Sequence, residues 1–178
     1  GLHNKYESSD LRDAAGRIAT SGRGEVLVRS PSIMLGYFER PDLDADAMLE
    51  GWFRTGDVGD LSDDGQLTLI GRIKTEINRG GIKIQAEEVD MLLERHPDIL
   101  EACAFGIPDV AAGEAVAAAI VLRAGTVFDA EAIKAWCRTQ ARPDVTPARL
   151  YVMDAIPRND RGKIVRADVR RIAEAGHG

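Results

Sequence analysis

The sequence predicts an α+β protein in two parts: a β-rich part over residues 1–71 and, over residues 72–178, a small domain with helices packed on a three-stranded sheet. Before residue 72, short apolar segments alternate with glycine and aspartate turn formers, whereas after it strand-length apolar runs alternate with segments of helical spacing. The charge also changes at this point. The first part holds 7 basic and 13 acidic residues, and the second holds 16 of each.

The first part opens with a polar stretch, Gly1–Arg23, which lacks a clear period and which we expect to be irregular or edge structure. Glu25–Arg29 alternates apolar and polar residues, as a half-buried strand does. Pro41–Leu49 is expected to form a short helix, because proline and early acidic residues are typical of a helix N-terminus.

Three short strands are expected next, at Trp52–Arg54, Val58–Leu61 and Gln66–Ile70. Turns at Gly56–Asp57 and Asp63–Gly65 separate them, since glycine and aspartate favour turns, and the second turn indicates a hairpin. The first part is therefore expected to be mostly β-structure.

In the second part, Gly80–Gly81 lies between strand-like pieces at Glu76–Arg79 and Ile82–Ile84. Helical spacing or capping predicts three helices, at Ala86–Arg95, from Asp129 to about Gln140, and at Val165–Ala175. Strands are expected at Ile99–Ile107, Ala115–Leu122 and Arg149–Met153, although the alanine-rich second run fits a buried helix as well as a strand.

Composition narrows the class of protein. The chain has 178 residues with 44% hydrophobic content, which supports a packed core. Its longest uncharged apolar run, Ala115–Leu122, is far shorter than the roughly 20 residues of a membrane-spanning helix, and the N-terminus does not resemble a signal peptide. A net charge of −6 argues against general nucleic-acid binding. Because the cysteine and histidine spacings do not resemble a metal site, we expect reduced thiols, a cytoplasmic protein and no structural metal, with His96 and Cys103 as packing residues.

Three stretches carry residue types suited to chemistry: Gly51–Asp57, Gly71–Ile84 and Pro157–Arg166. Asp57 offers a carboxylate suited to two vicinal hydroxyls, although taken alone an ordinary turn is the simpler interpretation. Gly80–Gly81 permits positive φ and close approach of the backbone to a ligand, or forms a plain hairpin.

The third stretch places Lys163 on a glycine-bearing loop from which its charge can reach an anionic transition state; the alternative is a solvated basic turn. The stretch lacks the glycine spacing of a Walker P-loop.

In this order and spacing the three stretches resemble the adenylate-forming superfamily, which contains acyl-CoA synthetases, luciferases and peptide-synthetase adenylation domains. The resemblance runs from about Gly24 to Arg171. It implies that Asp57 and Arg72 bind the ribose of ATP, that Gly80–Gly81 lines the pantetheine channel, and that Lys163 contacts the carboxylate and α-phosphate during adenylation. It also implies a hinge at Lys74, where peptide-synthetase domains usually have aspartate, so the chain is more similar to an acyl-CoA synthetase.

The resemblance implies ATP, Mg²⁺ and coenzyme A as cofactors and a carboxylic acid as substrate, with the Mg²⁺ ligands in a missing N-terminal domain of the same enzyme. Residues 1–71 are then the β-rich end of the large domain and residues 72–178 the mobile C-terminal domain. We expect this C-terminal piece alone to be inactive. A lysine acetyltransferase acting on Lys163 is a further expected partner. Two alternatives stay open: a noncatalytic regulatory or partner-binding module, and an enzyme that loads a carrier protein.

Overall fold

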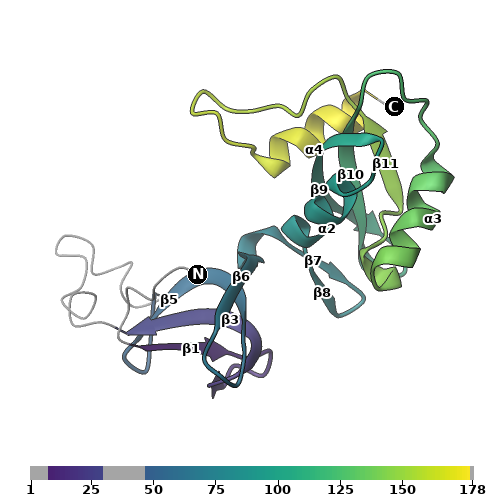
Figure 1. The fold of residues 1–178 in the computed structure, drawn as a ribbon. Helices are drawn as coiled ribbons and strands as arrows, with labels where there is room; N and C mark the ends of the chain where they lie inside the picture. Colours follow the sequence, from purple (N-terminus) through teal and green to yellow (C-terminus); the bar gives the residue numbers. More distant parts are fainter. Residues whose placement is uncertain (1–7, 30–46, 177–178) are drawn as a thin grey trace. The chain divides into compact units, whose positions relative to one another are not determined.

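The computed structural model describes residues 8–29 and 47–176, and these fall into two compact units, Gly1–Lys74 and Thr75–Gly178. In Figure 1, unit 1 is coloured from purple to blue and unit 2 from teal to yellow. The α+β class predicted from the sequence is confirmed. The division follows Lys74, three residues after the boundary that the change in charge indicated.

Unit 1 is an antiparallel sheet of six strands in the order β2-β1-β3-β5-β4, with β6 paired to β5. The strands are β1 (Ser8–Arg12), β2 (Ile18–Ala19), β3 (Gly22–Arg29), β4 (Met48–Leu49), β5 (Trp52–Leu61) and β6 (Leu67–Arg72). A small core of Leu11, Val26, Val28 and Leu61 holds the strands together. The expected strand at Glu25–Arg29, the hairpin between β5 and β6 and the β-rich character of this part are confirmed.

Three expectations for unit 1 were wrong. Gly1–Arg23 was expected to be irregular or edge structure, but β1 pairs with β2 on one side and β3 on the other and buries Leu11 in the core. The other two concern segments on or beside β5. The turn expected at Gly56–Asp57 is absent, because β5 is continuous through these residues and pairs with β3 and β6. Gly56, at φ 70°, lies in a bulge where the β3–β5 register shifts. Of the helix expected at Pro41–Leu49, residues 41–46 lie outside the described residues, and Met48–Leu49 pairs with β5 as a strand. In both places pairing with β5 overrides a local preference for a turn or a helix.

Unit 2 has a five-stranded sheet in the order β11-β10-β7-β8, with β9 on the other side of β10. Its strands are β7 (Glu76–Arg79), β8 (Ile82–Gln85), β9 (Ile99–Asp109), β10 (Gly113–Leu122) and β11 (Arg149–Val152), and only β11 is parallel to its neighbour. The three predicted strands are β9, β10 and β11. The β7–β8 hairpin adds two more through a single pair between Arg79 and Gly113.

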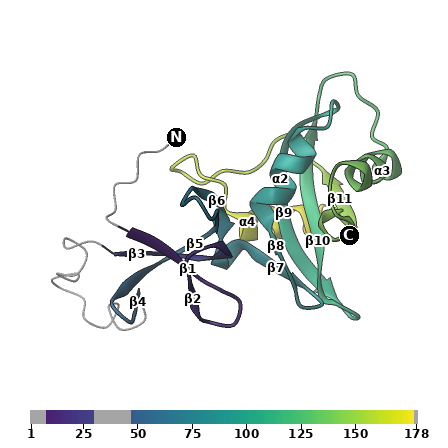
Figure 2. The ribbon, with the colours of Figure 1, turned by 60° about the horizontal axis from the view of Figure 1, so that its bottom comes forward.

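Helices cover both faces of this sheet (Figures 1 and 2). Helices α2 (Ala86–Glu94) and α3 (Ala130–Gln140) pack on one face, and α4 (Arg166–Ala175) packs on the other. Alternate residues of β10 point to the two cores, so Val116 and Ile120 face α2 and α3 while Ala117 faces α4. Burial on both faces explains why this run shows no polar alternation in sequence and why it forms a strand.

The outer edge of β9 is occupied by side chains of α2. The Asp90 carboxylate accepts the backbone N–H of Ala104 at 2.6 Å, and the Glu94 carboxylate accepts that of Ala102 at 3.3 Å. Asp90 and Glu94 lie four residues apart, on one face of α2, and Ala104 and Ala102 lie two residues apart, on one side of β9, so each carboxylate meets one N–H group. Helix α2 is therefore bonded to the sheet as well as packed on it.

In the described part of the chain, none of the helices is both long and apolar enough to cross a lipid bilayer.

Candidate functional site

Asp57 and Arg72, both expected to bind ribose, are brought together by unit 1. They are cross-strand partners on β5 and β6, and the Arg72 Nε lies 2.8 Å from the Asp57 Oδ1. The Asp57 side chain is 34% exposed and that of Arg72 50%, so both groups reach solvent. The Thr55 hydroxyl orients this part of β5, since it donates to the Val26 carbonyl at 2.8 Å and accepts the Asp57 N–H at 3.0 Å.

A bulge directs Asp57 to this position. The register of β5 shifts on both sides, against β3 between Glu25 and Leu27 and against β6 between Val58 and Gly59. Bulges of this kind re-aim a side chain out of the regular alternation, and they are common beside functional sites. The result is a partly exposed carboxylate held by a cation, an arrangement that can accept hydrogen bonds from vicinal hydroxyls.

Arg54, on the same strand, is a brace. Its Nε donates to the Glu25 carboxylate of β3 at 3.0 Å, and Glu25 is buried. A buried carboxylate needs such a partner to offset the cost of removing it from water. Arg54 thus braces β5 against β3.

Gly80 and Gly81 form the two-residue turn of the β7–β8 hairpin, with φ values of 60° and 88°. Positive φ at both positions is the type I′ pattern, which favours glycine. The Asn78 Oδ1 accepts the Gly81 N–H at 3.0 Å, and the Gly80 N–H donates to the Ala112 carbonyl at 2.7 Å. A Cβ at Gly81 would have no atom of the described residues within 4 Å, so this backbone is open to a ligand.

The loop that supports this turn is itself internally bonded. The Asp109 Oδ1 accepts the N–H groups of Ala111 and Ala112 at 3.0 and 2.8 Å, and the Glu114 carboxylate accepts the Asn78 N–H at 2.8 Å. The glycine turn therefore has a fixed position on unit 2.

Lys163 lies on the loop that joins β11 to α4, which projects from the body of unit 2 (Figure 1). The loop closes as a small hairpin, because Arg158 and Ile164 form an antiparallel bridge and Gly162 takes φ 75°. Lys163 is exposed, and its ammonium makes no ion pair with residues 8–29 or 47–176. An exposed, unpaired cation on a glycine-bearing loop is suited to meet an anionic group.

Both ends of this loop are tied to the sheet. Arg158 forms an ion pair with Glu101 of β9. At the other end the Arg166 guanidinium donates to the Ala104 carbonyl at 3.0 Å and to the Asp90 carboxylate at 2.7 Å. The side chains of Arg166 and Asp90 are only 20% and 18% exposed. Burial raises the pKa of the Asp90 carboxyl, and the Arg166 cation opposes that rise.

Lys74, the expected hinge, lies in a single 3-10 turn, Ile73–Thr75, which contains no buried residue. On one side Arg72 is paired with Asp57 inside unit 1, and on the other the Thr75 hydroxyl donates to the Glu87 carboxylate of α2 at 3.0 Å. Lys74 is thus the last residue of unit 1, between two residues that are each held within their own unit.

Comparison with known proteins identifies what these loops belong to. Residues 88–163 match the family described as the AMP-binding enzyme C-terminal domain. The oxalate–CoA ligase of Arabidopsis thaliana is 42% identical over 146 residues, which cover 82% of this chain and 28% of that protein. The chain belongs to the adenylate-forming superfamily.

Solved structures of this superfamily share the fold. The amide bond synthetase McbA from Marinactinospora thermotolerans is 36% identical with a TM-score of 0.81, over 93% of this chain and 34% of McbA. The o-succinylbenzoate CoA synthetase of Bacillus subtilis, in complex with its acyl-adenylate intermediate, is 29% identical with a TM-score of 0.80, over 92% of this chain and 34% of that one. The chain thus spans about a third of the length of these relatives.

Several residues that shape the superfamily loops were missed in the sequence analysis. Asn78 and Asn159 each accept N–H groups within their own loop, and asparagine near glycine is a known turn signal that we did not use. Asp90 and Glu114 act on segments 14 and 36 residues away, and no local pattern indicates such contacts.

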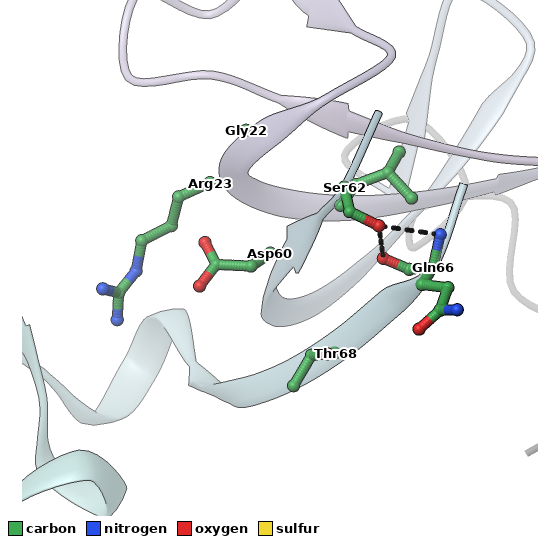
Figure 3. Close-up of a pocket in the computed structure, with 7 residues that line it drawn as sticks. Gly22, Arg23, Asp60, Ser62, Gln66 and Thr68 are labelled. Carbon is green, nitrogen blue, oxygen red and sulfur yellow. Dashed lines mark hydrogen bonds between the residues drawn. The ribbon is translucent and has the colours of Figure 1, made fainter. Parts of the chain in front are cut away.

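Two cavities lie near these elements. One, of about 350 Å³, is lined by Gly22, Arg23, Asp60, Leu61, Ser62, Gln66 and Thr68 of unit 1 (Figure 3). The other, of about 150 Å³, lies between the base of the Lys163 loop and α4. Neither cavity is lined by Asp57, Arg72 or Lys163.

The expected packing residues are buried. His96 packs edge-on against Trp136, and its Nδ1 accepts the Asp98 N–H at 3.1 Å. Burial raises the pKa of the Cys103 thiol to about 11, although Arg166 lies beside it. A thiol with this pKa carries little thiolate at neutral pH, so Cys103 is a packing residue rather than a nucleophile.

Proposed function

We propose that this chain is the C-terminal part of an ATP-dependent acyl-CoA synthetase, which converts a carboxylic acid, ATP and coenzyme A into acyl-CoA, AMP and pyrophosphate. The observation that carries the proposal is the exposed Lys163, which has no ion-pair partner within the described part of the chain, on a closed loop inside an AMP-binding enzyme C-terminal domain. Adenylation develops negative charge on the α-phosphate, and a positioned cation stabilises that charge.

In this proposal the residues of unit 1 hold the nucleotide. The Asp57 carboxylate accepts hydrogen bonds from the two ribose hydroxyls, and Arg72 holds the carboxylate in its orientation. The exposure of both side chains and the bulge that directs Asp57 outward support this assignment. The Mg²⁺ ligands and the acid pocket belong to residues outside this chain, so the chain alone is expected to make no acyl-adenylate.

Unit 2 serves both half-reactions. Lys163 acts during adenylation, and the backbone of Gly80–Gly81 borders the path of the pantetheine thiol during thioester formation. The openness of the Gly81 backbone supports the second role, because a bare backbone allows close approach of a narrow ligand. Rotation about Lys74 exchanges the two roles in this proposal, and its place at the division between the units supports it.

A second candidate keeps the adenylation step but changes the acceptor. The likeness to McbA, an amide bond synthetase, favours an amine in place of the CoA thiol. Loading of a carrier protein is a third possible acceptor reaction. Supplying preformed acyl-AMP with CoA, with an amine or with a carrier protein distinguishes these, since our proposal expects product only from CoA.

Lys163 is also the proposed target of a lysine acetyltransferase. The side chain is exposed on a projecting loop, where an enzyme can reach it. Acetylation would remove the charge that adenylation needs, so the modification would switch off the first half-reaction. The two cysteines are free and buried, and a reducing, cytoplasmic compartment stays part of the proposal.

The main test is Lys163→Ala in the complete ligase. Loss of one group that stabilises developing charge should slow adenylation about 10²–10³-fold, while thioester formation from preformed acyl-AMP and CoA survives. Arg161→Ala, which removes a neighbouring cation of the same loop, is the matched control and should change either rate less than about threefold. Normal adenylation by the Lys163 variant would refute the role. A complete ligase that binds ATP but never forms acyl-AMP would favour the noncatalytic module.

A further inference from the structure

The backbone of Lys163 is held by one residue of its own loop, Asn159. The Lys163 N–H donates to the Asn159 Oδ1 at 2.9 Å, and the Lys163 carbonyl accepts the Asn159 N–H at 2.9 Å. Both backbone polar groups of Lys163 are therefore bonded to the same residue. Arg17 with Asp13 and Gln66 with Ser62 form closed turns of the same kind, so the Lys163 loop is held as a hairpin turn is held.

Asn159 also sets the shape of the turn that precedes the lysine. Its Oδ1 accepts a second N–H, from Arg161 at 3.0 Å, and its carbonyl accepts the Gly162 N–H at 2.8 Å. An amide oxygen has two lone pairs, so the Asn159 side chain uses its full accepting capacity on this turn. The positive φ of Gly162 completes the reversal that brings Lys163 back beside Asn159.

The loop in turn has a fixed place on unit 2. Arg158, directly before Asn159, is paired with Glu101 of β9, and its Nη1 donates to the Gly162 carbonyl at 3.4 Å. The α-carbon of Lys163 is thus tied to the sheet through Asn159 and Arg158. The remaining freedom lies in the lysine side chain, which has a flexible four-carbon stem.

This matters because a cation stabilises developing charge only at close range. Donors act at about 2.7–3.1 Å from the oxygen, and a misplacement of about 1 Å can cost on the order of 10²-fold in rate. A lysine on a loose loop would sample many positions and rarely the productive one. Fixing the backbone of the lysine reduces the number of positions that its ammonium can sample.

We propose that Asn159 is a positioning residue for Lys163, which holds the backbone of the lysine so that its ammonium reaches the α-phosphate during adenylation. The inference rests on the proposed function of Lys163. Asn159 itself touches no substrate in this proposal and acts only through the lysine. Because Asn159 is exposed, its replacement leaves both cores of unit 2 intact.

The test uses the complete ligase with Asn159→Ala, which removes the acceptor, and Asn159→Asp, which keeps one at the same reach. Asp160→Ala, at the neighbouring exposed position, is the matched control. We expect Asn159→Ala to lower kcat for acyl-AMP formation roughly tenfold, with the KM for ATP and the melting temperature close to native, because the ribose contacts and the core are unchanged. Asn159→Asp should recover most of the rate, and Asp160→Ala should behave as native.

Thioester formation from preformed acyl-AMP should be the same in all three variants. A native rate in Asn159→Ala, an equal loss in Asn159→Asp, or a parallel fall of both half-reactions and the melting temperature would overturn the inference. Lys163→Ala is measured alongside. If that variant adenylates normally, the proposed function of Lys163 fails, whereas a slow Lys163→Ala with a native Asn159→Ala removes only the positioning role.

Discussion

Lys74 and Lys163 are both exposed lysines, but their backbones are held in opposite ways. Lys163 has both backbone polar groups bonded to Asn159, on a loop tied to β9 at each end. Lys74 lies in a single 3-10 turn without a buried residue, and the residues fixed within their units are its neighbours Arg72 and Thr75. The difference is that one charge is presented from a loop whose backbone is bonded internally, while the other lies at the division between the two units.

The contrast fits a division of labour. A group that stabilises a transition state gains from being held in place, whereas a hinge needs a few residues that absorb changes in φ and ψ. If unit 2 moves as one body in the proposed reaction, its loops keep their shape and only the connection changes. The next three predictions address this contrast.

The largest expected effect is on the anchor of the Lys163 loop. Arg166→Ala removes the partner of a mostly buried carboxylate, Asp90, and should lower the free energy of unfolding of unit 2 by about 3 kcal/mol. Urea unfolding of the 178-residue chain, followed by the helical circular dichroism signal, measures it. Arg170→Ala, which breaks an exposed pair with Glu174, should cost less than about 0.5 kcal/mol. Equal small effects would mean that the loop is not anchored in the core.

Lys74→Pro tests the other side of the contrast. Proline fixes φ near −65° and restricts the residue before it, so the turn should lose its freedom. If the locked geometry is the adenylating one, acyl-AMP formation by the complete ligase survives, while acyl-CoA formation falls roughly tenfold or more, about 1.4 kcal/mol in the barrier. Lys74→Ala removes the charge but keeps the freedom, and should leave both rates near native. Parallel loss of both activities with a lower melting temperature in the proline variant would contradict the hinge.

The smallest effect concerns Cys103, which lies at the base of the Lys163 loop with its sulfur 3.6 Å from an Arg166 nitrogen. Burial raises its pKa from 9.0 to about 11, so between these pH values the unfolded chain releases the proton first. The contribution of Cys103 to stability should therefore be constant below about pH 9 and fall as pH rises through this window.

The measurement is urea unfolding of the native chain and of Cys103→Ala at pH 8 and pH 10. The stability advantage of the native chain over the variant should shrink by about 1 kcal/mol between the two. A constant difference would show that the thiol is not shielded from water, and that the loop base is looser than the core.

The elements that could be predicted from the sequence are those whose signals are local. The apolar spacing of α2, the Asp129 cap of α3 and the glycine pair of the β7–β8 hairpin all have the structure that was predicted. The Asp129 side chain accepts the Ala132 N–H at 3.0 Å, as an N-cap residue does. The candidate site residues were chosen from motif resemblance, and their roles stay predictions.

What could not be predicted depends on contacts between distant residues. Gly56–Asp57 has the composition of a turn, but β5 pairs with strands on both sides of it, and the segment forms a bulge with Gly56 at φ 70°. The pairing of Asp90 with Arg166 joins residues 76 positions apart, which no periodicity reveals. Asn159 differs from these residues because its turn signal is local and visible in the sequence. Its contact with Lys163 could not be predicted, because only the structure shows both hydrogen bonds between the two residues.

The carboxylates of α2 on the edge of β9 have one more consequence. A free strand edge is a template on which another chain can add a strand, and this is a common route to aggregation. Here Asp90 and Glu94 already occupy the N–H groups of Ala104 and Ala102. Cross-chain addition at this edge would require α2 to detach first, so the same side chains that hold the helix also guard the protein against self-association.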